Sequence, residues 1–115
     1  MIYIANSFSF SMLPPPDDEI ETVVRVRRID DPAAWLAAVE TVSPPAVSAV
    51  GHADTARLYS ALLGRDVPQN RVAIQLTPDD DLLVGQIYGR LPEGCTTLPE
   101  GVIVRWLAVS VGNET

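Results

Sequence analysis

The segment "LLVGQIYGR", residues 82–90, is a short apolar run of strand-forming residues, and turn residues bound it on both sides. Upstream of it, "NRVAIQL", residues 70–76, alternates apolar and polar side chains, as a half-buried strand does. The intervening "TPDDD" has the composition of a turn. We therefore predict that the two segments pair as a β-hairpin.

Three other segments have strand patterns, because each is apolar or alternating and ends at polar or turn residues. They are "IYIA" (residues 2–5), "IETVVRVRRID" (residues 20–30), with one face in water, and "VIVRWLAVSV" (residues 102–111). Proline is excluded from sheet interiors, so "LPPPDDE" (residues 13–19) and "LPEGCTTLPEG" (residues 91–101) are predicted to be connectors. The run "AVSAV", residues 46–50, is too short to predict a strand.

Two helices are expected between these strands. An aspartate pair supplies N-cap chemistry before Pro32, and "PAAWLAAVE" follows as a short helix. In residues 54–63 the apolar side chains recur at helical spacing, and Gly64 is typical of the residue that ends a helix. The order β, β, α, α, β, β, β predicts an α+β fold with a mixed β-sheet of about five strands and helices packed on one face.

The composition limits the class of protein. With 115 residues, 47% of them hydrophobic, the chain fits a single domain over residues 1–115 with a modest core. The formal net charge is −7, and all eight basic residues are arginines, so non-specific binding of duplex nucleic acid is not expected. A small anion is still a possible ligand, because a few arginines that converge on one cleft create a local positive field.

The sequence gives little indication of a metal site, an internal disulfide or a membrane span. The only cysteine, Cys95, forms no internal disulfide, and no Cys/His cluster has the spacing of a zinc site. We interpret "TPDDD" as an acidic turn rather than a metal site, and we expect neither a metal nor a cofactor. The N-terminal segment has no basic region and no long apolar run, so we expect a cytoplasmic protein without a signal peptide or membrane span.

The only histidine, His52, lies at the start of the predicted helix and directly after Gly51, which gives the backbone freedom to move the imidazole. A helix N-terminus has unpaired N–H groups and a partial positive charge, and both attract phosphate. Arg71 and Arg90 lie at the ends of predicted neighbouring strands. The alternative is that His52 is structural and that the arginines are solvated strand ends paired with carboxylates.

Four motifs follow one another along most of the chain. They are "YIANSFSFSML", "GHADTARL", "NRVAIQL" and "DDLLVGQIYGRLPEG". Together they resemble the small viral and prophage ring nucleases that act as type III anti-CRISPR proteins. The resemblance implies a homodimer that binds cyclic tetra-adenylate, the second messenger of type III CRISPR effectors. It also implies that the protein cuts this ring without a metal into linear di-adenylates with 2′,3′-cyclic phosphate ends.

The resemblance also assigns roles to individual residues. The acid falls on His52, the phosphate-facing arginine on Arg90 and the accompanying carboxylate on Glu93. Ligand contacts fall on residues from four segments of the chain, namely Asn6, Ser9, Ser11, Arg71, Ile74 and Gln86. Relatives often have asparagine where this chain has Ser11, which would weaken one contact with the ring.

Three functions remain open from the sequence. The first is the ring nuclease, which would act in the host cytoplasm if the protein is viral. The second is a binding module that sequesters a cyclic oligonucleotide without cutting it, since one acid and no evident base are minimal machinery. The third is a small viral structural or adaptor protein in which His52 and Arg90 have no chemical role.

Overall fold

A computed structural model describes residues 1–14 and 21–112, so most of the predicted connector "LPPPDDE" lies outside the described residues. The chain forms one five-stranded mixed sheet with the order β2-β5-β4-β1-β3. The strands are β1 (Ile2–Ala5), β2 (Val23–Ile29), β3 (Val47–Ser48), β4 (Asp81–Tyr88) and β5 (Ile103–Gly112). The helices are α1 (Pro32–Val39), α2 (Ala53–Leu63) and the short 3-10 helix η1 (Phe10–Met12). The predicted α+β class and mixed sheet are confirmed.

The predicted hairpin between residues 70–76 and 82–90 is wrong. β4 pairs with β5 in the antiparallel sense and, from Asp81 to Val84, with β1 in the parallel sense, so its strand neighbours are β5 and β1 and not the upstream segment. Residues 70–76 form no strand and lie against the face of the sheet, where Leu76 is fully buried. Their alternation reflects packing of Ile74 and Leu76 on that face rather than strand pairing. The fifth strand is instead β3, inside "AVSAV".

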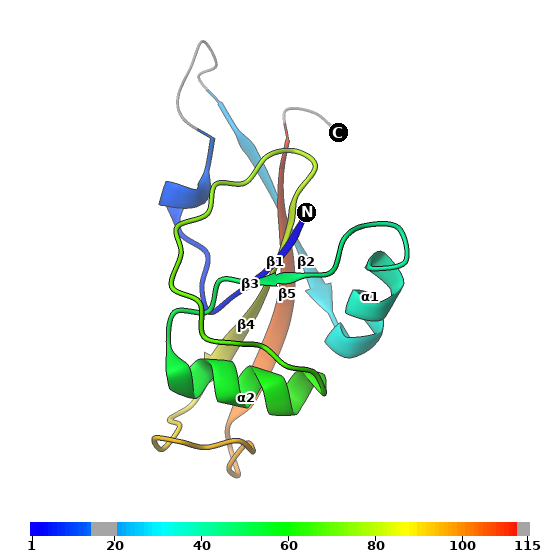
Figure 1. Ribbon diagram of the computed structural model, residues 1–115. Coiled ribbons are helices and arrows are strands. Elements are labelled where there is room, and N and C mark those ends of the chain that lie inside the picture. The colour runs from blue at the N-terminus through cyan, green and yellow to red at the C-terminus, as the bar shows by residue number, and fades with distance from the viewer. Residues whose placement is uncertain (15–20, 113–115) are drawn as a thin grey trace.

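Both α-helices cover one face of the sheet, as predicted (Figure 1). Leu36 of α1 and Tyr59 of α2 are fully buried there, against a layer that includes Leu83 and Trp106. α1 begins where local chemistry predicts, because the Asp31 carboxylate accepts a hydrogen bond from the Ala34 N–H at 3.1 Å. Among the residues described, no helix is long and apolar enough to cross a membrane.

The opposite face of the sheet has a second core that is covered by loops instead of helices. Leu82 and Val84 of β4 and Val109 of β5 pack there, with Leu76 from the chain that follows α2. The Leu76 N–H donates to the Met12 carbonyl at 2.7 Å, which joins that chain to η1. η1 and the segment around residue 76 therefore form the cover of this face (Figure 1).

A buried tyrosine completes β4 where its neighbour ends. β1 stops at Ala5, whose partner is Val84, so Gly85 is the first residue of β4 beyond this pairing. The Tyr59 hydroxyl donates to the Gly85 carbonyl at 2.8 Å and accepts from the Gly85 N–H at 2.9 Å. Burial raises the pKa of Tyr59 to about 12. The hydroxyl therefore takes the place of a strand and fixes α2 to the sheet.

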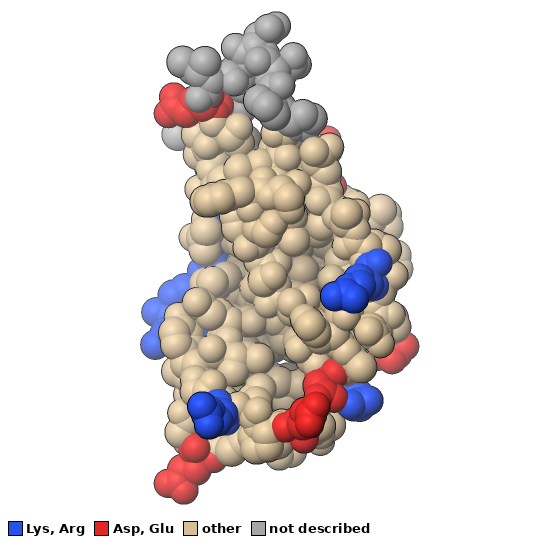
Figure 2. Space-filling view, turned by 90° about the vertical axis from the view of Figure 1, so that its left-hand side faces the viewer, with Lys and Arg blue, Asp and Glu red and all other residues tan. Residues whose placement is uncertain are grey.

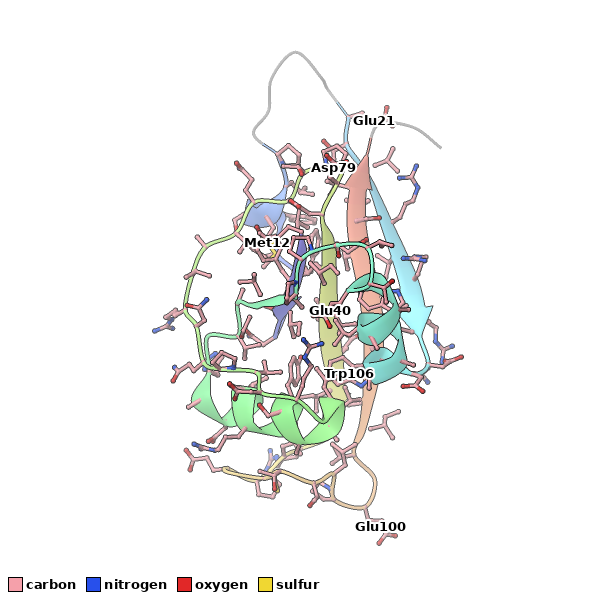
Figure 3. All side chains as sticks on the ribbon, turned by 45° about the vertical axis from the view of Figure 1, so that its right-hand side comes forward. Met12, Glu21, Glu40, Asp79, Glu100 and Trp106 are labelled. Atoms are coloured by element: carbon pink, nitrogen blue, oxygen red, sulfur yellow. The ribbon has the colours of Figure 1, made fainter. Side chains whose placement is uncertain are left out.

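The helices are also joined by an ion pair. Glu40 follows α1 and lies towards α2, as its label in Figure 3 shows. Both of its oxygens accept from the Arg65 guanidinium, at 2.9 and 2.7 Å, and one also accepts from the Ala46 N–H at 2.6 Å. The Glu40 and Arg65 side chains are 17% and 30% exposed, so water screens this pair less than a surface pair.

We expect Glu40→Gln to lower the free energy of unfolding by about 1–3 kcal/mol, because it removes a charge-assisted, two-pronged contact. The Arg65 hydrogen bonds hold the pKa of Glu40 below its usual value. Its contribution is therefore fully present above the unfolded pKa, about 4.3, and is lost as the pH falls through the lower folded pKa. Urea unfolding at pH 7 and at stepwise lower pH measures both effects. Asp54→Asn is the control, since its pair with Arg57 is exposed; an equal loss in both variants would contradict the assignment.

Candidate functional site

His52 is the N-cap residue of α2. Its backbone is extended, with φ −115° and ψ 131°, and its carbonyl accepts from the Ala56 N–H at 2.9 Å. The imidazole makes no capping hydrogen bond and is exposed to solvent. The side chain is therefore available for a ligand at a helix end where unpaired N–H groups favour an anion.

The chain around His52 follows from the direction of the strands. β1 runs parallel to both β3 and β4, so the carboxyl ends of these three strands point the same way. Asn6 follows β1, His52 comes shortly after β3, and Arg90 follows β4. Ligand sites in sheets with parallel strands commonly form outside their carboxyl ends. The topology therefore brings residues far apart in sequence to one end of the sheet.

Polar side chains hold the segment before His52 in place. The Asn6 side-chain oxygen accepts from the Gly51 N–H at 3.3 Å, and the Gln69 side chain donates to the Gly51 carbonyl at 3.1 Å. The Asn70 side chain donates to the Ser48 carbonyl at 2.7 Å, and its backbone N–H donates to the Val50 carbonyl at 2.8 Å. Sequence analysis missed Gln69 and Asn70 as positioning residues. The available signal was a pair of polar residues after a proline, a place where side chains often bond to the backbone.

A pocket of about 580 Å³ opens beside this segment. Its lining contains residues that the sequence assigned to the site from separate motifs, namely Asn6, Ser9, Ser11, His52 and Arg71. Figure 2 shows the side of the molecule on which η1 and the chain after α2 lie; its middle is uncharged, and both arginines and acidic residues lie around it. The pocket lining has one cation, Arg71, and no carboxylate. Its electrostatics therefore favour an anionic ligand despite the acidic composition.

Gly51 has a different role from the expected one. Its φ is not in the positive range, so this position does not require the conformational range of glycine. A Cβ at Gly51 would lie 3.6 Å from Cγ of Arg71, an ordinary contact distance. The stem of Arg71 lies beside the backbone next to His52, with room for a Cβ between them.

The remaining predicted residues lie outside this pocket. Glu93 lines a separate pocket of about 160 Å³ with Asp54 and Thr55, at the first turns of α2. The loop carrying it is fixed there, because the Gly94 N–H donates to the Asp54 carboxylate at 3.2 Å. The other three, Ile74, Gln86 and Arg90, line neither of the two pockets.

Each of these three residues has a structural reason for its position. Ile74 packs against the second core, and Gln86 accepts a hydrogen bond from the Tyr88 hydroxyl at 2.9 Å. Arg90 is exposed and follows β4. The pairing of β4 with β1 ends at Val84, and β4 continues to Tyr88. At about 3.3 Å per strand residue, this extension carries Arg90 more than about 10 Å farther than the end of β1.

Comparison with known proteins identifies the family of this chain. The model of the STIV B116-like family matches residues 2–102. The chain belongs to the STIV B116-like family. The matched range includes every residue assigned to the site, from Asn6 to Glu93. A comparison with curated protein sequences finds no significant match.

Among solved structures, the chain is similar to B116 of Sulfolobus turreted icosahedral virus. The TM-score is 0.74 at 23% sequence identity, over 95% of this chain and 97% of that chain. At this identity the similarity shows a shared fold. The two proteins therefore share the fold on which the His52 pocket lies, and the pocket residues named above are those of this chain.

No cluster of metal ligands is found in the part of the chain that the structure describes, where a cluster is three or more His, Cys, Asp or Glu side chains. Of the three aspartates at residues 79–81, the middle one closes a turn. Asp80 is buried and accepts from the Thr77 N–H and hydroxyl at 2.8 and 3.1 Å, which closes the turn that precedes β4. The chemistry available at the His52 pocket is therefore that of an imidazole, a guanidinium, hydroxyls and an amide.

Proposed function

We propose that this member of the STIV B116-like family is a metal-independent ring nuclease. It cleaves cyclic tetra-adenylate into linear di-adenylates with 2′,3′-cyclic phosphate ends and so inhibits type III CRISPR immunity. The observation that carries the proposal is the pocket that joins His52 to Arg71, Asn6 and the two serines Ser9 and Ser11. These are residues on which the resemblance to ring nucleases places the acid and the ligand contacts.

RNA supplies its own nucleophile, because a 2′-hydroxyl lies beside each phosphate. The 2′-oxygen attacks the phosphorus, the bond from phosphorus to the 5′-oxygen breaks, and the 2′-proton passes to water. His52 donates a proton to the departing 5′-oxygen. Arg71 holds the phosphate by charge-assisted hydrogen bonds and stabilises the extra charge of the transition state. The resemblance gives the same role to Arg90, which lies outside this pocket. No step requires a metal.

The symmetry of the ligand supports a homodimer. Four repeating nucleotides match a two-fold axis, because each subunit then presents the same residues to opposite phosphates. Each subunit makes one cut, and two cuts release two di-adenylates. The similarity to B116, a protein of a virus, supports a viral origin and the host cytoplasm as the place of action.

A second candidate function, sequestration of the ring without cleavage, is favoured by one observation. Among the residues that line the pocket, His52 is the only one whose side chain ordinarily titrates near neutral pH, and no carboxylate is present to act as a base. Slow cleavage and simple binding therefore begin from the same arrangement of groups, and only an assay of products separates them.

We expect incubation with cyclic tetra-adenylate in excess chelator to give linear di-adenylates with 2′,3′-cyclic phosphate ends, because the nucleophile is internal to the ligand. Liquid chromatography with mass detection identifies the products. Recovery of intact ring from a protein that binds it would favour sequestration. Activity that chelator abolishes and magnesium or manganese restores would contradict the metal-independent mechanism, and absence of both binding and products would contradict the proposed function.

A further inference from the structure

An exposed phenyl ring stands next to the His52 pocket. Phe10 is 83% exposed and begins η1. Its two neighbours in sequence, Ser9 and Ser11, both line the pocket. The lining also includes Met12 and Val72, and Phe10 is outside it, so the phenyl ring is an exposed aromatic surface carried between two residues of the pocket.

The position of Phe10 is fixed from several sides. The Ser9 hydroxyl accepts from the Ser11 N–H at 3.2 Å, and the Phe10 carbonyl accepts from the Leu13 N–H at 3.1 Å, so the short helix is closed at both ends. The ring of Phe8 meets the ring of Phe10 edge to face, with centroids 6.4 Å apart and planes at 88°. Phe8 itself packs against the second core.

This arrangement differs from that of Val42, another exposed apolar residue. Val42 is 88% exposed but lies in the loop after α1, away from the lining of every pocket described above. Single exposed apolar residues of that kind are common and need no explanation. Phe10, in contrast, is an exposed aromatic ring that meets a second ring edge to face and lies in the chain between two residues of the pocket. Aromatic side chains in such places provide stacking platforms for nucleobases.

We propose that Phe10 stacks on an adenine of the oligonucleotide bound in the His52 pocket. The inference rests on the proposed function and deepens it, because it divides recognition between two groups. Arg71 attracts the phosphates, which are the same in every nucleotide, whereas Phe10 contacts a base. The site then selects a ligand that carries nucleobases over one that offers phosphates alone.

The test uses a cyclic tetra-adenylate whose 2′-hydroxyls are replaced by hydrogen, which binds but has no nucleophile. Titration calorimetry is expected to show that Phe10→Ala binds about 5- to 100-fold more weakly than wild type, the range for loss of one aromatic stacking partner. Phe10→Trp is expected to bind like wild type because it keeps a stacking surface. Val42→Ala is the matched control for loss of an exposed apolar residue, and its affinity is expected to be unchanged.

The readouts separate this inference from the proposed function. With the cleavable ring, Phe10→Ala is expected to raise KM and leave kcat nearly unchanged, since the base contact acts on binding. Thermal melts of the variants are expected to match wild type because the side chain is exposed. Wild-type binding with equal affinity in Phe10→Ala would overturn the stacking contact alone. Failure of the wild-type protein to bind the ring would overturn the proposed function together with this inference.

Discussion

His52→Ala is expected to slow cleavage of cyclic tetra-adenylate by roughly 10²- to 10⁴-fold, the usual range for removal of a positioned acid. Affinity is expected to change much less, because the proposed mechanism leaves Arg71, Asn6 and the N–H groups at the start of α2 to contact the phosphates. Single-turnover cleavage gives the rate of the chemical step, and calorimetry with the uncleavable ring gives the affinity.

The matched variant is His52→Asn, because His52 is also the N-cap of α2. Asparagine is a preferred N-cap residue, so this change removes the acid while it preserves the start of the helix. Both variants are expected to melt like wild type and to cleave slowly. Rapid cleavage by the folded asparagine variant would remove His52 from the mechanism and leave it a role only in the helix.

Gly85→Ala is expected to lower the free energy of unfolding by about 2–5 kcal/mol, from overpacking together with loss of buried hydrogen bonds. A Cβ at Gly85 would lie 2.8 Å from the Tyr59 hydroxyl oxygen and 3.0 Å from Cζ3 of Trp106, closer than real contacts allow. Both neighbours are buried and cannot move aside (Trp106 is labelled in Figure 3). Urea unfolding at pH 7 measures the loss.

Tyr59→Phe is the companion variant, since it removes the hydroxyl without adding volume. It leaves the Gly85 N–H and carbonyl without this partner, and we expect a loss of about 1–3 kcal/mol. Because the folded pKa of Tyr59 is raised to about 12, its contribution is also lost in wild type as the pH rises from about 10 through 12. A Gly85→Ala protein as stable as wild type would contradict the close packing of α2 on β4.

Local chemistry in the sequence was sufficient for the helices and insufficient for one strand. Asp31 marks the start of α1 and Gly64 marks the end of α2, because capping depends on the few residues at a helix end. The alternation in residues 70–76 shows only that one side of an extended segment is dry. It does not tell whether the segment pairs with a strand edge or lies on a sheet face, and here it lies on the face.

The site was predicted unevenly for the same reason. Asn6, His52 and Arg71 meet in one pocket because β1 and β3 are parallel and end together, a fact of topology that no spacing in the sequence contains. Arg90 and Glu93 lie elsewhere because β4 extends beyond the end of β1, and the loop that follows β4 contacts α2 through Asp54. Only the resemblance to ring nucleases joined the two groups of residues.

The most direct test of the central claim is the NMR signal of the His52 imidazole, which is unambiguous because the chain has one histidine. Addition of the uncleavable cyclic tetra-adenylate is expected to shift the His52 Cε1–H resonance saturably, with the same dissociation constant that calorimetry gives. A control titration with short duplex DNA is expected to leave the resonance unchanged. A ring that binds while the His52 resonance stays in place, or a resonance that does not respond to any concentration of the ring, would contradict the assignment of this pocket as the cyclic oligoadenylate site.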